Sequence, residues 1–213
     1  MNIASIGLGL IGGSFALSLK KNFPEIKRFG MDKNPGHLQK ALELNIIDKA
    51  LRDEDLAKMD VIIVSIPVDN SSDVIQDVLD TIHTKALVMD MGSTKGELCA
   101  AIGKHPKRSQ FLAAHPIAGT EFSGPEAAFS SLFDHKTMIF CDIEDTEAHL
   151  VELAETLISP LEMTLKYMNS RDHDKHLAYV SHLSHISSFM LGKTVLQVEQ
   201  NDKTVFDLAG SGF

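Results

Sequence analysis

A glycine-rich stretch near the N-terminus limits the possible folds more than any other feature of the sequence. Residues 7–12 read GLGLIG and match the pattern G-x-G-x-x-G. They follow a short apolar run typical of a strand, Asn2–Ile6, and they open a segment with helical apolar spacing, Ile11–Lys21. A strand, a glycine loop and a helix in this order predict a unit that binds a dinucleotide. A purely structural glycine turn is the alternative interpretation.

The three glycines of the pattern have different expected roles. Gly7 permits the tight turn after the strand, Gly9 lets the backbone approach a diphosphate, and Gly12 lets the helix lie close to the strand. The diphosphate would accept hydrogen bonds from the free N–H groups at the N-terminus of the helix. Because those groups do not depend on basic side chains, the arrangement suits an acidic protein.

An acidic residue, Asp32, lies at the position expected for a dinucleotide site. Asp32 lies twenty positions after Gly12, directly behind a second predicted strand at Arg28–Met31. A carboxylate there accepts hydrogen bonds from the adenosine ribose hydroxyls and repels a 2′-phosphate, so it favours NAD over NADP. The adjacent Lys33 weakens this preference slightly and leaves NADP open. We therefore expect NAD as the cofactor.

The first part of the chain alternates between strand-like and helix-like segments. This alternation predicts an α/β fold of the Rossmann-like type, in which helices cover a parallel sheet. After the segments already named, the pattern predicts strands at Val61–Ile66, Ala86–Met91, Phe111–Ala114, Thr137–Cys141 and Met163–Tyr167, and helices at Pro35–Leu44, Val74–Ile82, Lys95–Ile102 and Thr146–Ile158.

The last part of the chain has a different character. Apolar residues recur at helical spacing from Arg171 to Gln200 without a strong turn signal, which predicts one long helix. Such a helix is too apolar to stand alone in water, so it should pack on a partner helix or a second subunit. A short helix is expected at Lys203–Leu208. We accordingly expect a dinucleotide-binding domain at residues 1–168 and the start of an incomplete all-helical domain at 169–213.

Charge and cysteine content exclude several classes of function. The formal net charge is −9, with 20 Lys and Arg against 29 Asp and Glu residues and no local basic patch, so neither nucleic acid nor an anionic membrane is an expected partner. No apolar run is long enough to span a membrane. The two cysteines, Cys99 and Cys141, show no C-x-x-C spacing, which favours reduced thiols and a cytoplasmic location.

Two loops at predicted strand ends complete a candidate site. Residues 90–96 read DMGSTKG, and residues 114–121 read AHPIAGTE. Because ligands of open α/β sheets bind outside the carboxyl ends of the strands, both loops should face the glycine loop across one crevice. A neutral His115 would accept a proton from an alcohol whose carbon gives hydride to a nicotinamide, and Ser93 would orient the hydroxyl or the nicotinamide edge. The alternative is a histidine that merely caps a turn before a proline.

Together these patterns give a set of expected cofactor-binding residues. They come from the glycine loop, the end of the second strand, the Ser-Ile-Pro stretch that ends the strand from Val61, and the loop after the following strand: Gly7, Gly9, Leu10, Ile11, Gly12, Asp32, Lys33, Ser65, Ile66, Pro67 and Ser93.

Four stretches of the sequence resemble the prephenate/arogenate dehydrogenases of tyrosine biosynthesis. They read GLGLIGGS at 7–14, GSTKG at 92–96, HPIAGTE at 115–121 and HLSH at 182–185. The first is shared with many dehydrogenases, whereas HPIAGTE is specific to this family. The four occur in the family's order, so the resemblance extends over essentially the whole chain.

The resemblance implies a mechanism as well as a fold. The helical domain would form a homodimer and close over a small-molecule substrate, prephenate or arogenate. His115 would accept the hydrogen bond from the ring hydroxyl of prephenate as hydride leaves for NAD+, with Ser93 assisting. Loss of the ring carboxylate as CO2 would then yield 4-hydroxyphenylpyruvate. The implied substrate-binding residues are Gly119, Thr120, Glu121, His182 and His185.

The chain departs from the family pattern at its C-terminal end. In the family, a stretch similar to the Gly-Ser-Gly-Phe that ends at Phe213 is followed by an Arg that binds a substrate carboxylate, and then by more helices. We therefore expect a truncated form of the enzyme. An arogenate dehydrogenase and an NAD-binding module without activity are the alternatives.

A metal site is the remaining alternative for the histidines of the last part. His173 and His176 are three residues apart, as are His182 and His185, and aspartates lie nearby. No ligand set with a recognised spacing is completed, so no metal is expected.

Overall fold

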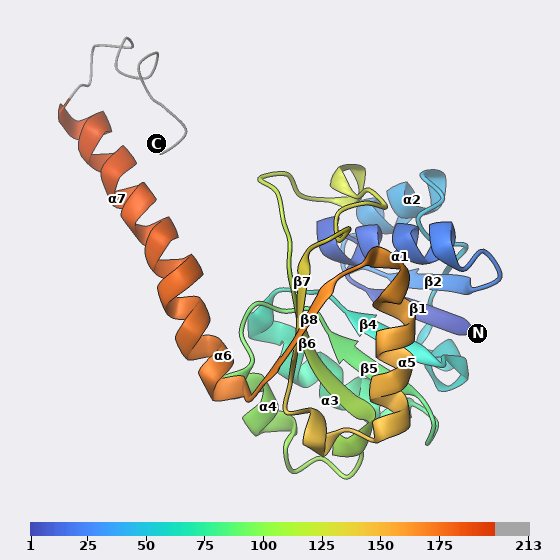
Figure 1. Ribbon diagram of the computed structural model, residues 1–213. Helices are drawn as coiled ribbons and strands as arrows, with labels where there is room; N and C mark the ends of the chain where they lie inside the picture. The colour runs from blue at the N-terminus through green and yellow to red at the C-terminus, as the bar shows by residue number, and fades with distance from the viewer. Residues whose placement is uncertain (199–213) are drawn as a thin grey trace. The chain divides into compact units, whose positions relative to one another are not determined.

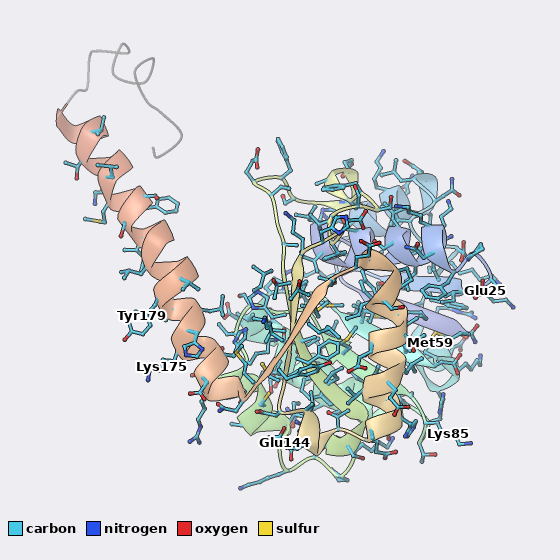
Figure 2. All side chains as sticks on the ribbon, viewed as in Figure 1. Glu25, Met59, Lys85, Glu144, Lys175 and Tyr179 are labelled. Carbon is cyan, nitrogen blue, oxygen red and sulfur yellow. The ribbon has the colours of Figure 1, made fainter. Side chains whose placement is uncertain are left out.

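The computed structural model describes the backbone of residues 1–198 (Figure 1) and their side chains (Figure 2), apart from the side chains of residues 181, 182, 184, 185 and 196–198. The short helix predicted at Lys203–Leu208 lies outside the described residues. The chain divides into two compact units, Met1–Ser170 and a second unit from Arg171 onward. No helix in the described part of the chain combines the length and the apolar character needed to cross a membrane.

A single twisted sheet forms the centre of the first unit. Its eight strands, within the described residues, lie in the order β3-β2-β1-β4-β5-β6-β7-β8. In chain order they are β1 (Asn2–Ile6), β2 (Lys27–Met31), β3 (Lys49–Ala50), β4 (Val61–Val64), β5 (Leu87–Asp90), β6 (Phe111–Ile117), β7 (Thr137–Cys141) and β8 (Thr164–Met168). The order of the first six strands is that of a Rossmann-like fold, which confirms the predicted fold class.

Five α-helices belong to the described first unit. They are α1 (Leu10–Asn22), α2 (Pro35–Glu43), α3 (Ser71–Thr81), α4 (Gly96–Ile102) and α5 (Ala148–Ile158). The start of α2 shows why the sequence folds this way locally. The Asn34 side chain accepts a hydrogen bond of 2.9 Å from the Gly36 N–H, and Pro35 occupies the first turn, where its missing N–H costs nothing.

The expectation of a parallel sheet is wrong at one strand pair. β6 and β7 run antiparallel, with His115 opposite Ile139, whereas β7 and β8 are parallel. The segment between β6 and β7 contains a short 3₁₀ turn at Pro125–Ala127 but no α-helix that would carry the chain across the sheet. Parallel neighbours need such a crossover, so β7 returns antiparallel to its partner.

Two differences from the sequence predictions concern β6 and β3. β6 continues to Ile117, three residues beyond the predicted end at Ala114, because β7 supplies hydrogen-bonding partners on its outer side. β3 has only two residues, Lys49 and Ala50, and both are exposed. The sequence therefore carries no apolar signal for β3, and none was predicted there.

The core of the first unit explains why the central strands are continuous apolar runs. All four residues of β4 are buried, because helices cover both faces of a sheet with these crossovers. α1 packs through Phe15 and Leu19, and the Phe15 ring meets Phe133 edge to face at 6.0 Å between ring centroids. Because only residues 7–9 separate β1 from α1, the N-terminus of α1 lies at the carboxyl end of β1.

The second unit, as far as it is described, is helical. α6 (Ser170–Leu177) passes through a π-helical turn (Ala178–His182) into α7 (Leu183–Val198), where one continuous helix was predicted from Arg171 to Gln200. Large apolar side chains remain exposed along it: Tyr179, Val180, Leu183, Ile186, Phe189, Met190 and Leu191.

Candidate functional site

The glycine loop folds tightly against the end of β4. Gly7 has a φ of +91°, and a Cβ atom there would lie 2.4 Å from the carbonyl oxygen of Ser65. A Cβ atom on Gly12 would lie 2.1 Å from the carbonyl oxygen of Gly7 and 2.2 Å from Ser65 Oγ. Ser65 Oγ donates a 2.9 Å hydrogen bond to the same Gly7 oxygen. Both positions therefore require glycine for packing within the protein itself.

Gly9 is different, because nothing in the protein crowds it. A Cβ atom at this position would meet no heavy atom within 4 Å. Gly9 is the N-cap residue of α1, and among the described residues no side chain caps this end of the helix and no acidic residue occupies its first turn. The first N–H groups of the helix have no acceptor within the helix, and an uncapped helix start with open space at Gly9 suits an anion such as a diphosphate.

Asp32 connects the glycine loop to the end of β2. Its Oδ2 accepts a 2.8 Å hydrogen bond from the Leu8 N–H, and its Oδ1 accepts one of 2.9 Å from the Asn34 N–H. His37 Nδ1 lies 3.5 Å from Oδ1. The carboxylate thus holds the loop in addition to the ribose contact expected from the sequence, and each oxygen keeps a second lone pair. Lys33 is exposed beside it.

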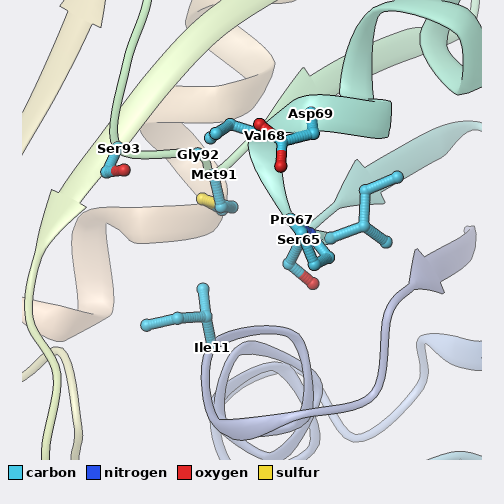
Figure 3. Close-up of a pocket in the computed structure, with 9 residues that line it drawn as sticks. Ile11, Ser65, Pro67, Val68, Asp69, Met91, Gly92 and Ser93 are labelled. Atoms are coloured by element: carbon cyan, nitrogen blue, oxygen red, sulfur yellow. The ribbon is translucent and has the colours of Figure 1, made fainter.

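A cavity of about 350 Å³ opens between the start of α1 and the ends of β4 and β5 (Figure 3). Five of the expected cofactor-binding residues line it together: Ile11, Ser65, Ile66, Pro67 and Ser93. The sequence interpretation missed four others: Val68, Asp69, Met91 and Gly92. Their positions in the sequence could have indicated them: Val68 and Asp69 directly follow the Ser-Ile-Pro stretch at 65–67, and Met91 and Gly92 belong to the loop stretch at 90–96. Leu10 begins α1 beside Ile11.

A buried ion pair flanks the stretch Met91–Ser93, which contributes to the cavity wall. Lys95 and Asp90 are both almost fully inaccessible to solvent, and the Lys95 ammonium donates to Asp90 Oδ2. Gly92 N–H donates to the same oxygen at 2.9 Å, and Ala114 N–H donates to Oδ1 at 3.2 Å. Burial raises the pKa of the Asp90 carboxyl, while Lys95 and the two N–H groups act in the opposite direction. One carboxylate thereby joins the end of β5 to β6.

The two candidate catalytic residues each directly follow a residue whose N–H donates to this carboxylate. Ser93 follows Asp90 in the loop after β5, and His115 follows Ala114 in β6. The prediction that His115 lies in a loop beyond a strand is wrong, because the antiparallel pairing with β7 extends β6 through it. His115 is half-buried at the same carboxyl edge of the sheet, but it is not among the residues that line the cavity.

The expected substrate-binding residues of the first unit are not among the described residues that line the cavity. Gly119, Thr120 and Glu121 are exposed in the loop after β6, where Thr120 Oγ1 accepts a 3.2 Å hydrogen bond from the Phe122 N–H. The side chains of His182 and His185 lie outside the described residues. Among the side chains that are described, no three His, Cys, Asp or Glu residues are grouped so that they could hold a metal ion.

Comparison with known proteins assigns the chain to a family. A family model described as the nucleotide-binding domain of prephenate dehydrogenase matches residues 15–166. The chain belongs to the prephenate dehydrogenase family. A second model of the same family, described as its dimerization domain, matches residues 169–213.

Individual relatives agree with this assignment. The chain is 30% identical to prephenate dehydrogenase of Bacillus subtilis over 97% of its own length, and it spans 57% of that protein. It is 27% identical to cyclohexadienyl dehydrogenase of Zymomonas mobilis over 95% of its length and spans 70% of that protein. The chain thus spans between 57% and 70% of the length of these two curated relatives.

Solved structures show the same fold. Prephenate dehydrogenase of Aquifex aeolicus, crystallised with hydroxyphenyl propionate and NAD+, superposes with a TM-score of 0.89 at 30% identity, covering the whole chain and 75% of that structure. Arogenate dehydrogenase of Synechocystis superposes with a TM-score of 0.82 at 25% identity, covering the whole chain and 76% of that structure.

Proposed function

We propose that the chain is the NAD-dependent part of a prephenate dehydrogenase, which converts prephenate to 4-hydroxyphenylpyruvate in tyrosine biosynthesis. The observation that carries this proposal is the open, uncapped N-terminus of α1 at Gly9, together with the cavity lined by Ile11 and Ser93. This geometry accommodates a dinucleotide, and the family model matched over residues 15–166 is a nucleotide-binding domain.

The described residues fit NAD at both ends of the site. The diphosphate would bind at Gly7, Gly9, Leu10 and Gly12, at the uncapped start of α1, where the Gly9 position is open. The adenosine ribose would bind at Asp32, whose carboxylate disfavours the 2′-phosphate of NADP, with Lys33 beside it. The nicotinamide end would enter the cavity lined by Ile11, Ser65, Ile66, Pro67 and Ser93.

The chemistry divides between the cofactor and the side chains. When bound, NAD+ supplies the acceptor for a hydride from the carbon that bears the ring hydroxyl. His115 would accept the hydrogen bond from that hydroxyl and so help the carbonyl character develop, and Ser93 would orient the same group. The ring carboxylate leaves as CO2, its bonding electrons completing the aromatic ring, while the oxygen remains as the phenol. The protein mainly aligns the reacting groups, because aromatisation makes the step downhill.

The loop after β6 and the helical unit would hold the substrate. Glu121 would lie at the mouth of the site, with Gly119 and Thr120 in the same exposed loop. His182 and His185 would contribute from the helix of the second unit. The support for these assignments is the match of their sequence stretches to the family pattern.

Arogenate is the second candidate substrate. The chain resembles an arogenate dehydrogenase of Synechocystis and a cyclohexadienyl dehydrogenase of Zymomonas mobilis nearly as well as it resembles the prephenate dehydrogenases. Arogenate carries an amino group where prephenate carries a keto group, and its product would be tyrosine. A chain that binds NAD without turnover is the remaining alternative.

The assembly and location follow from the same proposal. Residues 1–168 would form the cofactor domain, and residues 169–213 would belong to a helical domain through which two copies form a homodimer. The exposed apolar side chains of α7 and the match to a dimerization-domain model support this arrangement. Two free, buried thiols, Cys99 and Cys141, support a cytoplasmic location.

The test is a turnover assay on the protein that carries this chain. Incubation with NAD+ and prephenate should yield NADH and 4-hydroxyphenylpyruvate in equal amounts, and a parallel incubation with arogenate measures the second candidate. Faster turnover of arogenate would replace the proposed substrate with that one. Tight NAD+ binding with no turnover of either substrate would contradict the enzymatic function.

A further inference from the structure

The cavity beside the glycine loop has an acidic side chain in its wall. Asp69 lies next to Val68 in the 3₁₀ turn Val68–Asn70 that precedes α3 (Figure 3). The other described lining residues are apolar, glycine or serine, so Asp69 is the single charged residue among them. Whatever part of a ligand occupies the cavity therefore meets one negative charge without a compensating Lys, Arg or His in the described wall.

The position of Asp32 determines which end of a dinucleotide would reach this cavity. Asp32 follows β2, which lies on one side of β1, whereas the cavity lies at the ends of β4 and β5 on the other side. A dinucleotide whose diphosphate binds at the glycine loop and whose adenosine ribose binds at Asp32 would enter the cavity with its nicotinamide end. This step rests on the proposed function.

The nicotinamide ring changes its charge during the reaction. The ring carries one positive charge in NAD+ and none in NADH, whereas the diphosphate carries the same charge in both. A carboxylate in the wall therefore interacts differently with the ring in the two redox forms, while its repulsion of the diphosphate is common to both and cancels in their ratio. A side chain shifts a binding preference only through such a differential interaction.

We propose that Asp69 makes the cavity selective for the oxidised cofactor over the reduced one. The carboxylate favours NAD+ before the reaction and favours the release of NADH after it. Asp69 is exposed, so water and salt weaken the attraction. At low ionic strength the preference attributable to this charge should be about two- to fivefold in the ratio of dissociation constants, as expected for unit charges separated by several ångströms in water.

The test is a calorimetric titration of NAD+ and of NADH into the chain and its Asp69→Asn variant, which removes the charge with little change in shape. We expect the ratio of the NAD+ to the NADH dissociation constant to rise about two- to fivefold in the variant, and this rise to shrink in about 1 M salt, where the screening length is only about 3 Å. Asp73→Asn is the matched control, because it removes the same charge from the exposed first turn of α3 outside the cavity.

Each outcome bears on a different claim. An unchanged ratio in Asp69→Asn, with both forms still bound, would overturn the role of Asp69 and leave the proposed function standing. An equal shift in Asp73→Asn would also overturn it, because the effect would then be one of net charge. Failure of the unaltered chain to bind either form would overturn the proposed function and this inference with it.

Discussion

At the level of single residues, the glycine loop combines positions with opposite constraints. Gly12 is confined by atoms of the protein, since the Gly7 carbonyl oxygen and Ser65 Oγ occupy the space a side chain would need. Gly9 is confined by nothing in the protein. If the loop exists to hold a diphosphate, the space at Gly9 is reserved for the ligand, and the two positions should respond differently to the same change.

The paired substitutions Gly12→Ala and Gly9→Ala test this difference. Gly12→Ala should lower the free energy of unfolding by about 3 kcal/mol, because the methyl group overlaps backbone atoms. Gly9→Ala should leave thermal stability nearly unchanged and weaken NAD+ binding at least about tenfold, because its methyl group points into the ligand's space. Urea denaturation and NAD+ titration of both variants measure the two effects. Equal loss of stability in both would contradict this interpretation of the loop.

Asp90 and Lys95 are a second residue-level feature, and a sequence alone does not reveal it. Both side chains are buried, and the N–H groups of Gly92 and Ala114 also donate to the Asp90 carboxylate. In the sequence, Lys95 is merely part of a Gly-Ser-Thr-Lys-Gly stretch. Its ammonium group compensates the negative charge of the buried Asp90 carboxylate, at the loop that carries Ser93.

Removal of one partner should therefore be costly. Lys95→Met leaves the Asp90 carboxylate buried without its cation and should reduce the free energy of unfolding by about 3–5 kcal/mol. Combining it with Asp90→Asn should cost clearly less than the sum of the two single changes. A double-mutant cycle in urea measures the coupling. Strict additivity would show that the two groups do not stabilise one another.

At the level of elements, the sequence predicts what depends on local pattern and misses what depends on pairing. The apolar runs and caps place β1, α1, α2 and β7 within one or two residues of their observed bounds. The antiparallel β7 and the extension of β6 through His115 follow from which strand lies next to which, and a local pattern does not contain that information. β3, with two exposed residues, has no apolar pattern to detect.

The same distinction applies to the candidate site. The glycine spacing and Asp32 were visible because each has a fixed place in a strand–loop–helix unit. Asp69 and Met91 lie in the cavity wall only because the ends of β4 and β5 are adjacent in the sheet. That adjacency is a property of the assembled sheet.

Two buried thiols, one in α4 and one in β7, lead to a prediction about alkaline stability. Burial, followed by the nearby Asp142, raises the pKa of the Cys99 thiol in α4 to about 12, and burial raises the pKa of the Cys141 thiol in β7 as well. Thiols in the unfolded chain ionise near pH 8.5, so above about pH 9 the unfolded state releases protons that the folded state retains. Stability is therefore fully present below pH 8.5 and declines as the pH rises toward 12.

The Cys99→Ala variant isolates this contribution. Each thiol should remove up to about 1.4 kcal/mol of stability per pH unit above the unfolded pKa. The variant should therefore lose less stability than the unaltered chain between pH 9 and 11, as measured by urea midpoints at each pH. Parallel pH profiles for the two proteins would contradict the assignment of the alkaline loss to this buried thiol.

At the level of the whole molecule, the helical part carries apolar surface that its own described residues do not cover. Leu183, Ile186, Phe189 and Met190 are each more than half exposed on α7. A helix with so much exposed apolar area gains stability by packing against another chain or domain. In the proposed homodimer, α7 would lie in the subunit interface.

Substitution on α7 tests that assembly. Ile186→Glu places a charge in the proposed interface and should shift the protein from dimer to monomer in sedimentation velocity at micromolar concentration, because an unpaired charge is costly to bury. Phe122→Glu is the matched control: it replaces a similarly exposed apolar residue in the first unit and should leave the dimer intact. Dissociation by the control alone, or a dimeric Ile186→Glu protein, would place the interface elsewhere.

The most direct test of the proposed function compares His115→Asn with the unaltered protein in two measurements. One is the rate of NADH formation from prephenate and NAD+, and the other is the dissociation constant of NAD+. Loss of a group that accepts the substrate proton should reduce turnover about 10²- to 10⁴-fold, while the NAD+ dissociation constant should change less than about threefold. Unchanged turnover in His115→Asn would contradict the account.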